Sequence, residues 1–211
     1  MSIQSKSVFK NMPQNFVVTK LKNFVDRLSH SRLRGFDLYR NSPDRHVLED
    51  VIIPHIKSRH ELQKILFVGC DWYTKPYKKL FKHKEYWTIE IDRKKQKYGA
   101  DNHIIDGLQN LSKYIQPSYF DVIIYNGVFG YGINTRRDTE ESFHQCFQAL
   151  RPGGILVFGW NDVPQCKPFP VLEECENLKQ FLPYHFAPLS ATKYLTPHTV
   201  LRHTFNFYIR P

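Results

Sequence analysis

The sequence has no apolar run long enough to span a membrane and no cysteine pattern typical of a metal site or a disulfide framework. None of its 211 residues falls in a window approaching the roughly 20 apolar residues that a membrane-spanning helix needs. The first stretch, MSIQSKSVFKNMPQNF, lacks the apolar core of a secretory signal. The 4 cysteines form no CxxC pair and have no histidine at ligand spacing. We therefore expect a soluble, cytoplasmic protein with no transmembrane segment and no bound metal.

The glycine fingerprint GxGxxG is also missing. That pattern holds the pyrophosphate of a dinucleotide at a strand–turn–helix unit. Its absence makes a nicotinamide-dependent dehydrogenase the weakest hypothesis for this chain. At 65–77 the sequence instead reads ILFVGCDWYTKPY, in which Gly69 is followed by an aspartate and two aromatic residues.

Positive charge is present in excess and is concentrated in two segments. Of the formal net charge of +10, residues 1–60 contribute +6, with 11 Lys and Arg against 5 Asp and Glu. Residues 75–97 contribute another +6, with 9 against 3. These segments permit RNA, an anionic surface or a phosphorylated substrate as a partner. A solvated lysine-rich face explains them equally well, because no RNA-binding motif accompanies them.

Apolar runs recur along the chain and alternate with helical patterns. Runs without polar alternation suit strands that are buried on both faces of a parallel sheet. Together with two later segments that alternate, the runs predict strands at 64–68, 86–91, 120–126, 154–160, within 187–196 and at 203–209. The alternation of strands with helices along the chain predicts a doubly wound α/β sheet.

Helical spacing of apolar residues predicts four helices between or beside these strands. The first covers 44–54 and stops or kinks at Pro54. The second lies over 73–81 with Thr74 as its cap, and the third begins at Asp138, which forms a capping-box pattern with Glu141. The fourth places Val171, Cys175, Leu178 and Leu182 on one stripe. The chain should therefore consist of a basic, partly helical N-terminal appendage over 1–43 and one α/β domain over 44–211.

Small and acidic residues stand at the predicted strand ends. In an open α/β sheet, the ligand lies beyond the carboxyl ends of the strands. Gly69 ends the first strand, and Glu90 follows 21 residues later, the offset at which an acid accepts hydrogen bonds from ribose hydroxyls. Asp106–Gly107 in HIIDGL form a third strand end, and Asn126–Gly127 form a fourth after FDVIIY. Asp92 competes with Glu90 for this role, and Asp106 could also cap the segment GLQNLSKYI.

Together with the motif ALRPGGILVF at 149–158, these strand ends resemble a class I S-adenosylmethionine-dependent methyltransferase over about residues 45–211. The resemblance implies a Rossmann-like, doubly wound, seven-stranded mixed sheet whose late hairpin adds an antiparallel strand. The turn also has a physical reason, since we expect Gly153 and Gly154 to take positive φ angles between a helix and a central strand.

The resemblance implies S-adenosylmethionine as the cofactor and assigns a role to each matching position. Glu90 would hold the ribose diol, Ile91 would pack on the adenine, and Asp106 would meet the adenine amino group with Leu108 beside it. The methionine and ribose side would be lined by Val68, Gly69 and Cys70, while Asn126 and Gly127 would lie next to the transferred methyl group. The cofactor-binding residues expected in full are Val68, Gly69, Cys70, Asp71, Glu90, Ile91, Asp106, Gly107, Leu108, Asn126 and Gly127.

The loop after the first strand departs from the family pattern. The usual acid two residues before the first glycine is Phe67 here, and the second and third glycines are Asp71 and Tyr73. One interpretation is that Asp71 supplies a carboxylate to the cofactor's ammonium group while Trp72 or Tyr73 closes over the methionine. The other is that CDWYT packs against the N-terminal appendage and narrows or shuts the pocket.

Residues after the strands predicted at 120–126 and 154–160 are the candidates for acceptor binding. Tyr131 lies in GYGINT at 130–135, which is either a mobile lid or a surface turn. Trp160 and Asn161 end the strand predicted at 154–160 and are predicted to contact the substrate. Tyr131 and Asp162 are the candidates for a catalytic role. The acids and amides at these ends are too few to indicate a metal.

The function expected from the resemblance is methyl transfer to oxygen or nitrogen of a small or medium-sized acceptor. Such a site mainly aligns a nucleophile with the methyl group and excludes water. Two alternatives stay open, a non-catalytic binding protein of the same fold and an RNA methyltransferase that uses the basic segments. The sequence specifies neither the acceptor nor the oligomeric state.

Overall fold

The computed structural model describes residues 42–169 and 172–211. Residues Ser42–Pro211 form one compact unit. The expected N-terminal appendage, with its predicted helix, lies outside the described residues except for its last two positions, so it stays a prediction.

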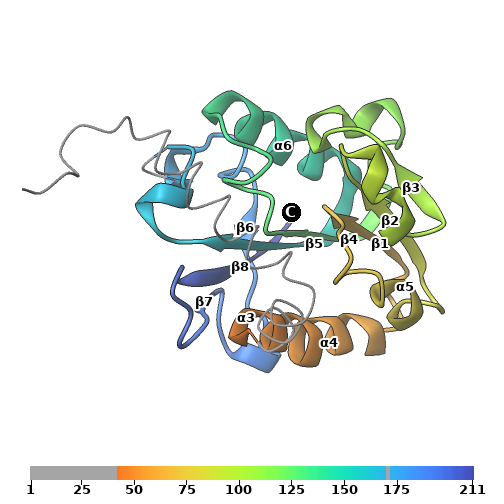
Figure 1. The fold of residues 1–211 in the computed structure, drawn as a ribbon, viewed down its shortest axis with the longest axis horizontal. Coiled ribbons are helices and arrows are strands. Elements are labelled where there is room, and N and C mark those ends of the chain that lie inside the picture. Colours follow the sequence, from red (N-terminus) through yellow and green to blue (C-terminus); the bar gives the residue numbers. More distant parts are fainter. Residues whose placement is uncertain (1–41, 170–171) are drawn as a thin grey trace, which may run out of the picture. The chain divides into compact units, whose positions relative to one another are not determined.

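The described residues form an eight-stranded, mostly parallel sheet (Figure 1). Its order is β3-β2-β1-β4-β5-β8-β6, and β7 pairs with β8. Strands β3 to β5 of this order are parallel, and β8 is antiparallel to β5. The strands are β1 Lys64–Val68, β2 Glu85–Ile89, β3 Asn102–Ile104, β4 Phe120–Asn126, β5 Leu150–Asn161, β6 Leu182–Pro183, β7 Lys193–Leu195 and β8 His203–Ile209. The doubly wound fold is therefore confirmed.

The seven-stranded expectation differs from the structure at one edge of the sheet. Two short strands, β6 and β7, both pair with β8, opposite Tyr208–Ile209 and Thr204–Asn206 respectively. They occupy successive lengths of the same edge: β7 is the strand predicted within 187–196, and β6 is additional.

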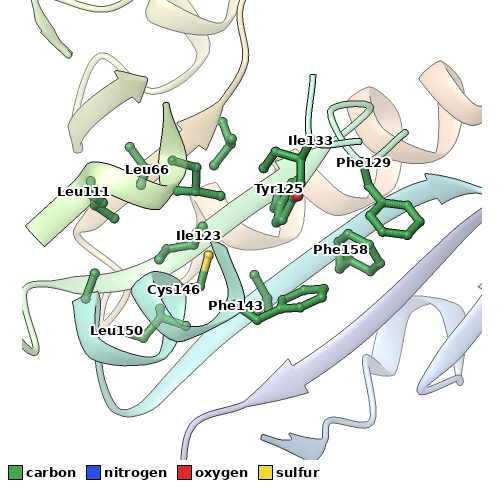
Figure 2. Packing of buried hydrophobic residues seen from close by; sticks show 14 of the residues in the cluster. Leu66, Leu111, Ile123, Tyr125, Phe129, Ile133, Phe143, Cys146, Leu150 and Phe158 are labelled. Atoms are coloured by element: carbon green, nitrogen blue, oxygen red, sulfur yellow. The ribbon is translucent and has the colours of Figure 1, made fainter. Parts of the chain in front are cut away.

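Helices cover both faces of the sheet (Figure 1). One face packs against α6 Arg136–Ala149 and the 3₁₀ segment η3 Leu108–Lys113. The other packs against the helical segment 43–58 and α5 Tyr77–Leu80. Figure 2 shows the first of these cores, where side chains of β4 and β5 meet Phe143 and Cys146 of α6. Six of the seven β4 residues are buried, which explains why β4 reads as a continuous apolar run.

Of the two alternatives predicted at Pro54, a stop or a kink, the stop is wrong, because the helical segment runs on to Ser58. It consists of α3 Pro43–His46, the π-helical η1 Val47–Ile52 and α4 Ile53–Ser58. The N–H of Ile53 donates to the carbonyl of Leu48, five residues back. A proline ring normally collides with the carbonyl four residues earlier, and the wider π turn accommodates it.

The predicted helix over 171–182 is wrong as well. The structure has only the 3₁₀ turn η5 Leu172–Glu174, followed by further turns and β6. The buried residues there recur every three positions, at Leu172, Cys175, Leu178 and Phe181, which suits tight turns rather than an α-helix. The carboxylate of Glu140 accepts the backbone N–H groups of Glu176 and Asn177, each at 2.9 Å, so α6 holds these turns in place.

Two helices are not capped by the residues that were predicted to begin them. The cap of α6 is Thr135, whose hydroxyl accepts the N–H of Asp138 at 3.0 Å, so Asp138 lies in the first turn. Thr74 caps no helix, since its hydroxyl bonds back to the backbone of Asp71 and leaves α5 one turn long. The remaining short segments are the 3₁₀ turns η2 Arg93–Tyr98, η4 Pro164–Cys166 and η6 Ala187–Leu189.

The LRPGG turn is held by an ion pair in which the acid, Asp121, is buried and Arg151 is partly exposed. Asp121, at the start of β4, accepts hydrogen bonds from Nε of Arg151 at 2.5 Å and from the backbone N–H groups of Gln63 and Lys64 at 2.7 and 2.8 Å. Of the two glycines, Gly153 alone has a positive φ, of 73°. The expectation of a positive φ at Gly154 is wrong; a Cβ there would lie 2.8 Å from the carbonyl oxygen of Arg151, so close packing is the reason for that glycine.

Asp121→Ala should destabilise the protein at neutral pH. The carboxylate is only 12% exposed, and leaving its donors unpaired costs about 2–4 kcal/mol. For a chain of this size the melting temperature should then fall by roughly 5–15 °C. Scanning calorimetry measures it, with Asp50→Ala, on a side chain 68% exposed, as a control that changes little.

The same substitution has a predictable pH dependence. Burial acts to raise the pKa of Asp121, but the hydrogen bonds from Arg151 and the backbone outweigh it and the pKa is lowered. A lowered pKa contributes stability above the unfolded value of about 4, and that contribution is lost as pH falls through the folded pKa. The difference between wild type and Asp121→Ala should therefore shrink below about pH 4; a constant difference would contradict this role.

Candidate functional site

The carboxyl ends of the five parallel strands lie at one edge of the sheet. Strands β1, β2, β3, β4 and β5 run in the same direction. The residues that follow or end these strands, and that the sequence singled out, therefore share this edge: Gly69, Glu90, Asp106, Asn126 and Asn161. Such an edge is where open α/β sheets bind ligands.

Gly69 and Glu90 are brought together at the ends of β1 and β2. Gly69 has φ of 79°, and its N–H donates to the carbonyl of Ile89 at 2.8 Å. A Cβ on Gly69 would lie 2.7 Å from Cγ2 of Val128 and 4.0 Å from Oε2 of Glu90. The chain therefore needs glycine both for its backbone angle and for its close neighbour.

The carboxylate of Glu90 is fixed by two backbone groups. Oε2 accepts the N–H of Cys70 at 3.1 Å, and Oε1 accepts the N–H of Asp92 at 2.9 Å. Each oxygen then retains a lone pair for a further donor. Asp92 itself caps η2 by accepting the N–H of Lys94 at 2.9 Å, so of the two acids it is Glu90 that faces the Gly69 loop.

The apolar neighbours of this pair differ in exposure. Val68 is buried in the core. Cys70 is also buried, which raises the pKa of its thiol to about 12 and leaves it unreactive at neutral pH. Ile91 is 68% exposed although it directly follows Glu90. An exposed aliphatic side chain beside a fixed carboxylate is suited to packing on a flat ring.

The loop CDWYT bonds to its neighbours on two sides. The Nζ of Lys95 lies 2.9 Å from Oδ2 of Asp71. Burial acts to lower the pKa of Lys95, but the hydrogen bond that Lys95 donates to Asp71 outweighs it, so the pKa is raised. The Tyr73 ring lies beneath the guanidinium of Arg45 at 4.1 Å and packs edge-on against Trp72. Tyr73 is thus turned toward α3, and Asp71 toward η2; the role of Asp71 toward a ligand stays a prediction.

Asp106 stands at the end of β3 as an acceptor. Its Oδ1 accepts the N–H of Gly107 at 2.7 Å and the side-chain amide of Asn110 at 2.8 Å, and its Oδ2 accepts the Tyr114 hydroxyl at 3.0 Å. The bond from Asn110 is the main reason that the pKa of Asp106 is lowered. Leu108 beside it is buried. The carboxylate is therefore ionised and can accept further hydrogen bonds.

Two of the predicted acceptor-side residues meet in one polar chain with a residue that the sequence did not single out. Nδ2 of Asn161 donates to the Tyr131 hydroxyl at 2.7 Å, and Oδ1 of Asn161 lies 2.7 Å from Nδ1 of His203. Nε2 of His203 lies 3.0 Å from Oδ1 of Asn126. Next to Asn126, Gly127 has φ of 72°, and a Cβ there would have no atom within 4 Å apart from its chain neighbours. The alternation in HTFNFYI, which places His203 on the face of Phe205 and Phe207, is the signal that could have found it.

Trp160 and Asp162 lie apart from this chain. Trp160 is buried in the core of the opposite face, stacked on Phe158, and its indole N–H donates to Asn206 at 2.9 Å. The carboxylate of Asp162 is ion-paired with Lys167 at 2.7 Å. The predicted roles of these two residues toward a substrate receive no support from this geometry.

Metal and membrane motifs are missing from the described part of the chain. Across residues 42–169 and 172–211, no three or more His, Cys, Asp or Glu side chains are grouped so that they could hold a metal. No helix in the same ranges is long and apolar enough to cross a membrane.

The chain is similar to known proteins in its three-dimensional structure. No protein-family model and no curated protein sequence matches the chain. The N-methyltransferase NodS from Bradyrhizobium japonicum, solved with S-adenosyl-L-homocysteine, is similar with a TM-score of 0.63 at 14% identity, over 90% of this chain and 97% of NodS. A Burkholderia thailandensis 1,6-didemethyltoxoflavin N1-methyltransferase is similar with a TM-score of 0.56 at 11% identity, over 97% and 93%.

An rRNA methylase from Streptococcus thermophilus is also similar, with a TM-score of 0.53 at 15% identity, over 76% of this chain and 94% of the methylase. At such identities the likeness establishes the fold. The chain therefore has the fold of the class I S-adenosylmethionine-dependent methyltransferases, as the strand ends and the LRPGG turn predicted.

Proposed function

We propose that the chain is a methyltransferase that binds S-adenosylmethionine at the carboxyl edge of β1, β2 and β3. The observation that carries this proposal is the Glu90 carboxylate, which two backbone N–H groups hold beside the positive-φ Gly69. A carboxylate in this position is suited to accept both hydroxyls of a ribose. The exposed Ile91 and the ionised Asp106 supply an apolar surface and an acceptor for the adenine.

The chemistry asks the protein mainly for alignment. When bound, S-adenosylmethionine supplies an activated methyl group, and the protein positions the acceptor and excludes water. The polar chain of Tyr131, Asn161, His203 and Asn126 lies at the ends of β4 and β5, where an acceptor would meet that group. Burial lowers the pKa of His203, so its ring is a hydrogen-bonding group at neutral pH rather than a cation.

We infer that the acceptor is a small or medium-sized molecule methylated at oxygen or nitrogen. Two of the similar structures are N-methyltransferases, and one of them is named for the small molecule 1,6-didemethyltoxoflavin. Amides and a hydroxyl, as in the polar chain, can hold the polar groups of such an acceptor.

A radiolabel experiment tests this function. The protein is incubated with methyl-labelled S-adenosylmethionine and a cell extract, which is then separated into small-molecule, RNA and protein fractions. Label should accumulate in the small-molecule fraction in proportion to enzyme, and Glu90→Gln should abolish most of it. Label confined to the RNA or protein fraction would contradict the proposed acceptor class.

RNA is a second candidate acceptor because of the basic surface of η2 and the segment around α5. Six exposed cations there make no ion pair with any described residue: Lys75, Lys79, Lys82, Arg93, Lys94 and Lys97. Cations without such partners are available to phosphates.

The salt dependence of RNA binding distinguishes this candidate. If RNA is the acceptor, the dissociation constant for single-stranded RNA should rise steeply with salt. The double variant Lys79→Glu, Lys82→Glu should bind about tenfold more weakly, since each charge contributes to the phosphate term. Lys113→Glu, an exposed change on η3 at the other face of the sheet, is the matched control. Equal affinities for all three proteins would remove RNA as an acceptor.

A further inference from the structure

The loop after β1 lacks two of the glycines that shape this loop in the family pattern. Asp71 and Tyr73 stand at those positions. Among residues 65–77, all of which the structure describes, only Gly69 has a positive φ, of 79°. Glycine backbone angles therefore cannot give the rest of the loop its shape, and side-chain bonds have to do so.

Asp71 closes the turn that replaces those glycines. Its N–H donates to Oγ1 of Thr74 at 3.0 Å, and its carbonyl accepts the N–H of Thr74 at 2.9 Å. Its Oδ1 accepts the N–H of Trp72 at 2.7 Å. These bonds fix the backbone on both sides of Asp71 and leave its Oδ2 for a contact outside the turn.

Lys95 of η2 makes that contact. Its Nζ lies 2.9 Å from Oδ2 of Asp71, and both side chains are partly exposed. The carbonyl oxygen of Lys95 also accepts the thiol of Cys70 at 3.6 Å. Lys95 therefore holds two successive residues of the loop, one through its side chain and the other through its backbone.

These contacts enclose the Glu90 carboxylate. The N–H of Cys70 donates to its Oε2, and the N–H of Asp92, the cap of η2, donates to its Oε1. The bond between Lys95 and Asp71 closes a ring of contacts that runs from the loop to η2 and back through Glu90. Since Cys70 directly precedes Asp71, a shift of Asp71 changes the direction in which the N–H of Cys70 points.

We propose that Lys95 is a positioning residue, which holds Asp71 so that the loop after β1 keeps the Glu90 carboxylate in place for a ribose. This proposal rests on the proposed function, in which Glu90 accepts the ribose hydroxyls. It also assigns Asp71 to the loop rather than to the ammonium group of the ligand. Both carboxylate oxygens of Asp71 already accept a bond, one from the N–H of Trp72 and one from Lys95.

The two roles of Asp71 predict opposite effects of removing Lys95. If Asp71 held the ammonium group of the ligand, Lys95 would compete for the same carboxylate, and Lys95→Met would strengthen binding. If Lys95 positions the loop, Lys95→Met should weaken binding, because the N–H of Cys70 no longer holds Glu90 in its place.

Calorimetric titration with S-adenosylhomocysteine and with 5′-methylthioadenosine tests the proposal. The second ligand has the same adenosine but no amino acid part, so it has no ammonium group for Asp71. Lys95→Met and Asp71→Asn should each weaken the binding of both ligands by the same factor, about fivefold. The double variant should lose no more than either single variant, because the pair acts as one unit.

Two further variants serve as controls in the same titrations. Lys95→Arg keeps the charge and should retain most of the affinity. Lys179→Met removes a lysine from the exposed pair with Glu176 and should leave both affinities unchanged. Unchanged or tighter binding in Lys95→Met would overturn the proposal, and so would a loss in Asp71→Asn that is confined to S-adenosylhomocysteine.

Thiol labelling gives a second readout that needs no ligand. Cys70 is buried, so its reaction with iodoacetamide, located by mass spectrometry, requires the loop to open. Lys95→Met should label Cys70 at least about threefold faster than wild type, whereas Lys179→Met should not, and equal rates would overturn the positioning role. If the wild-type protein binds neither ligand, the proposed function fails, and the labelling rates still decide whether Lys95 holds the loop.

Discussion

Glu90→Ala should reduce the affinity for S-adenosylhomocysteine by about 100-fold or more. Hydrogen bonds to a charged group contribute about 1.5–3 kcal/mol each, and this carboxylate is proposed to accept two from the ribose. Its own geometry is fixed in advance by the N–H groups of Cys70 and Asp92, so the wild-type protein loses little entropy in orienting it. Glu90→Gln, which keeps the shape but loses the charge, should lose about tenfold.

Isothermal titration calorimetry measures this loss, and Asp101→Asn is the matched control. Asp101 is an acid at the start of the next strand region, 82% exposed and paired with Lys78, so its loss should leave the affinity within about twofold. The melting temperature of each variant separates lost binding from lost folding. An affinity in Glu90→Ala equal to that of wild type would show that the carboxylate does not hold the ligand.

Gly69→Ala should lose both stability and ligand affinity. A side chain at φ of 79° costs about 1–2 kcal/mol, and the new Cβ would lie 2.7 Å from Cγ2 of Val128. Relieving that overlap moves the loop after β1 or the loop after β4, which together border the proposed site. We expect a melting temperature lower by roughly 5–10 °C and binding weakened at least about tenfold, because a small displacement of the site disturbs every ligand contact.

Two further variants identify the cause of this loss. Gly127→Ala has a similar backbone cost, at φ of 72°, but no atom lies within 4 Å of its Cβ, so it should lower the melting temperature less than Gly69→Ala. Adding Val128→Ala to Gly69→Ala should restore part of the stability by removing the overlap. If Gly69→Ala and Gly127→Ala melt at the same temperature, the contact with Val128 has no role.

The sheet could be predicted from the sequence because its central strands are buried on both faces. Such strands appear as unbroken apolar runs, and the fixed direction of parallel strands places their ends at one edge. The helices were harder to place. The π turn before Pro54 and the three-residue spacing from Leu172 to Phe181 resemble ordinary helical patterns until the hydrogen bonds are known.

The candidate site also has residues that the sequence predicted and residues that it did not. Gly69, Glu90 and Asp106 follow strands that are adjacent in the sheet, so spacing along the chain predicted that they share an edge. His203 is 77 residues from Asn126, and it reaches the site because β8 inserts antiparallel beside β5. That contact depends on Gly159, because a Cβ there would lie 1.8 Å from Oδ1 of Asn126, and sequence alone marks Gly159 only as a break in an apolar strand. Trp160 is the opposite case, since a substrate contact was predicted for it while alternation along β5 turns its side chain into the core.

The measurement that tests the central claim most directly is calorimetric titration of the wild-type protein with S-adenosylhomocysteine. If Glu90, Gly69 and the strand ends around them form the cofactor site, binding should occur with one ligand per chain and a dissociation constant in the micromolar range, about −8 kcal/mol, and the ligand should raise the melting temperature. Neither heat nor a thermal shift at millimolar ligand would contradict the account, and the chain would then be a non-catalytic protein of this fold.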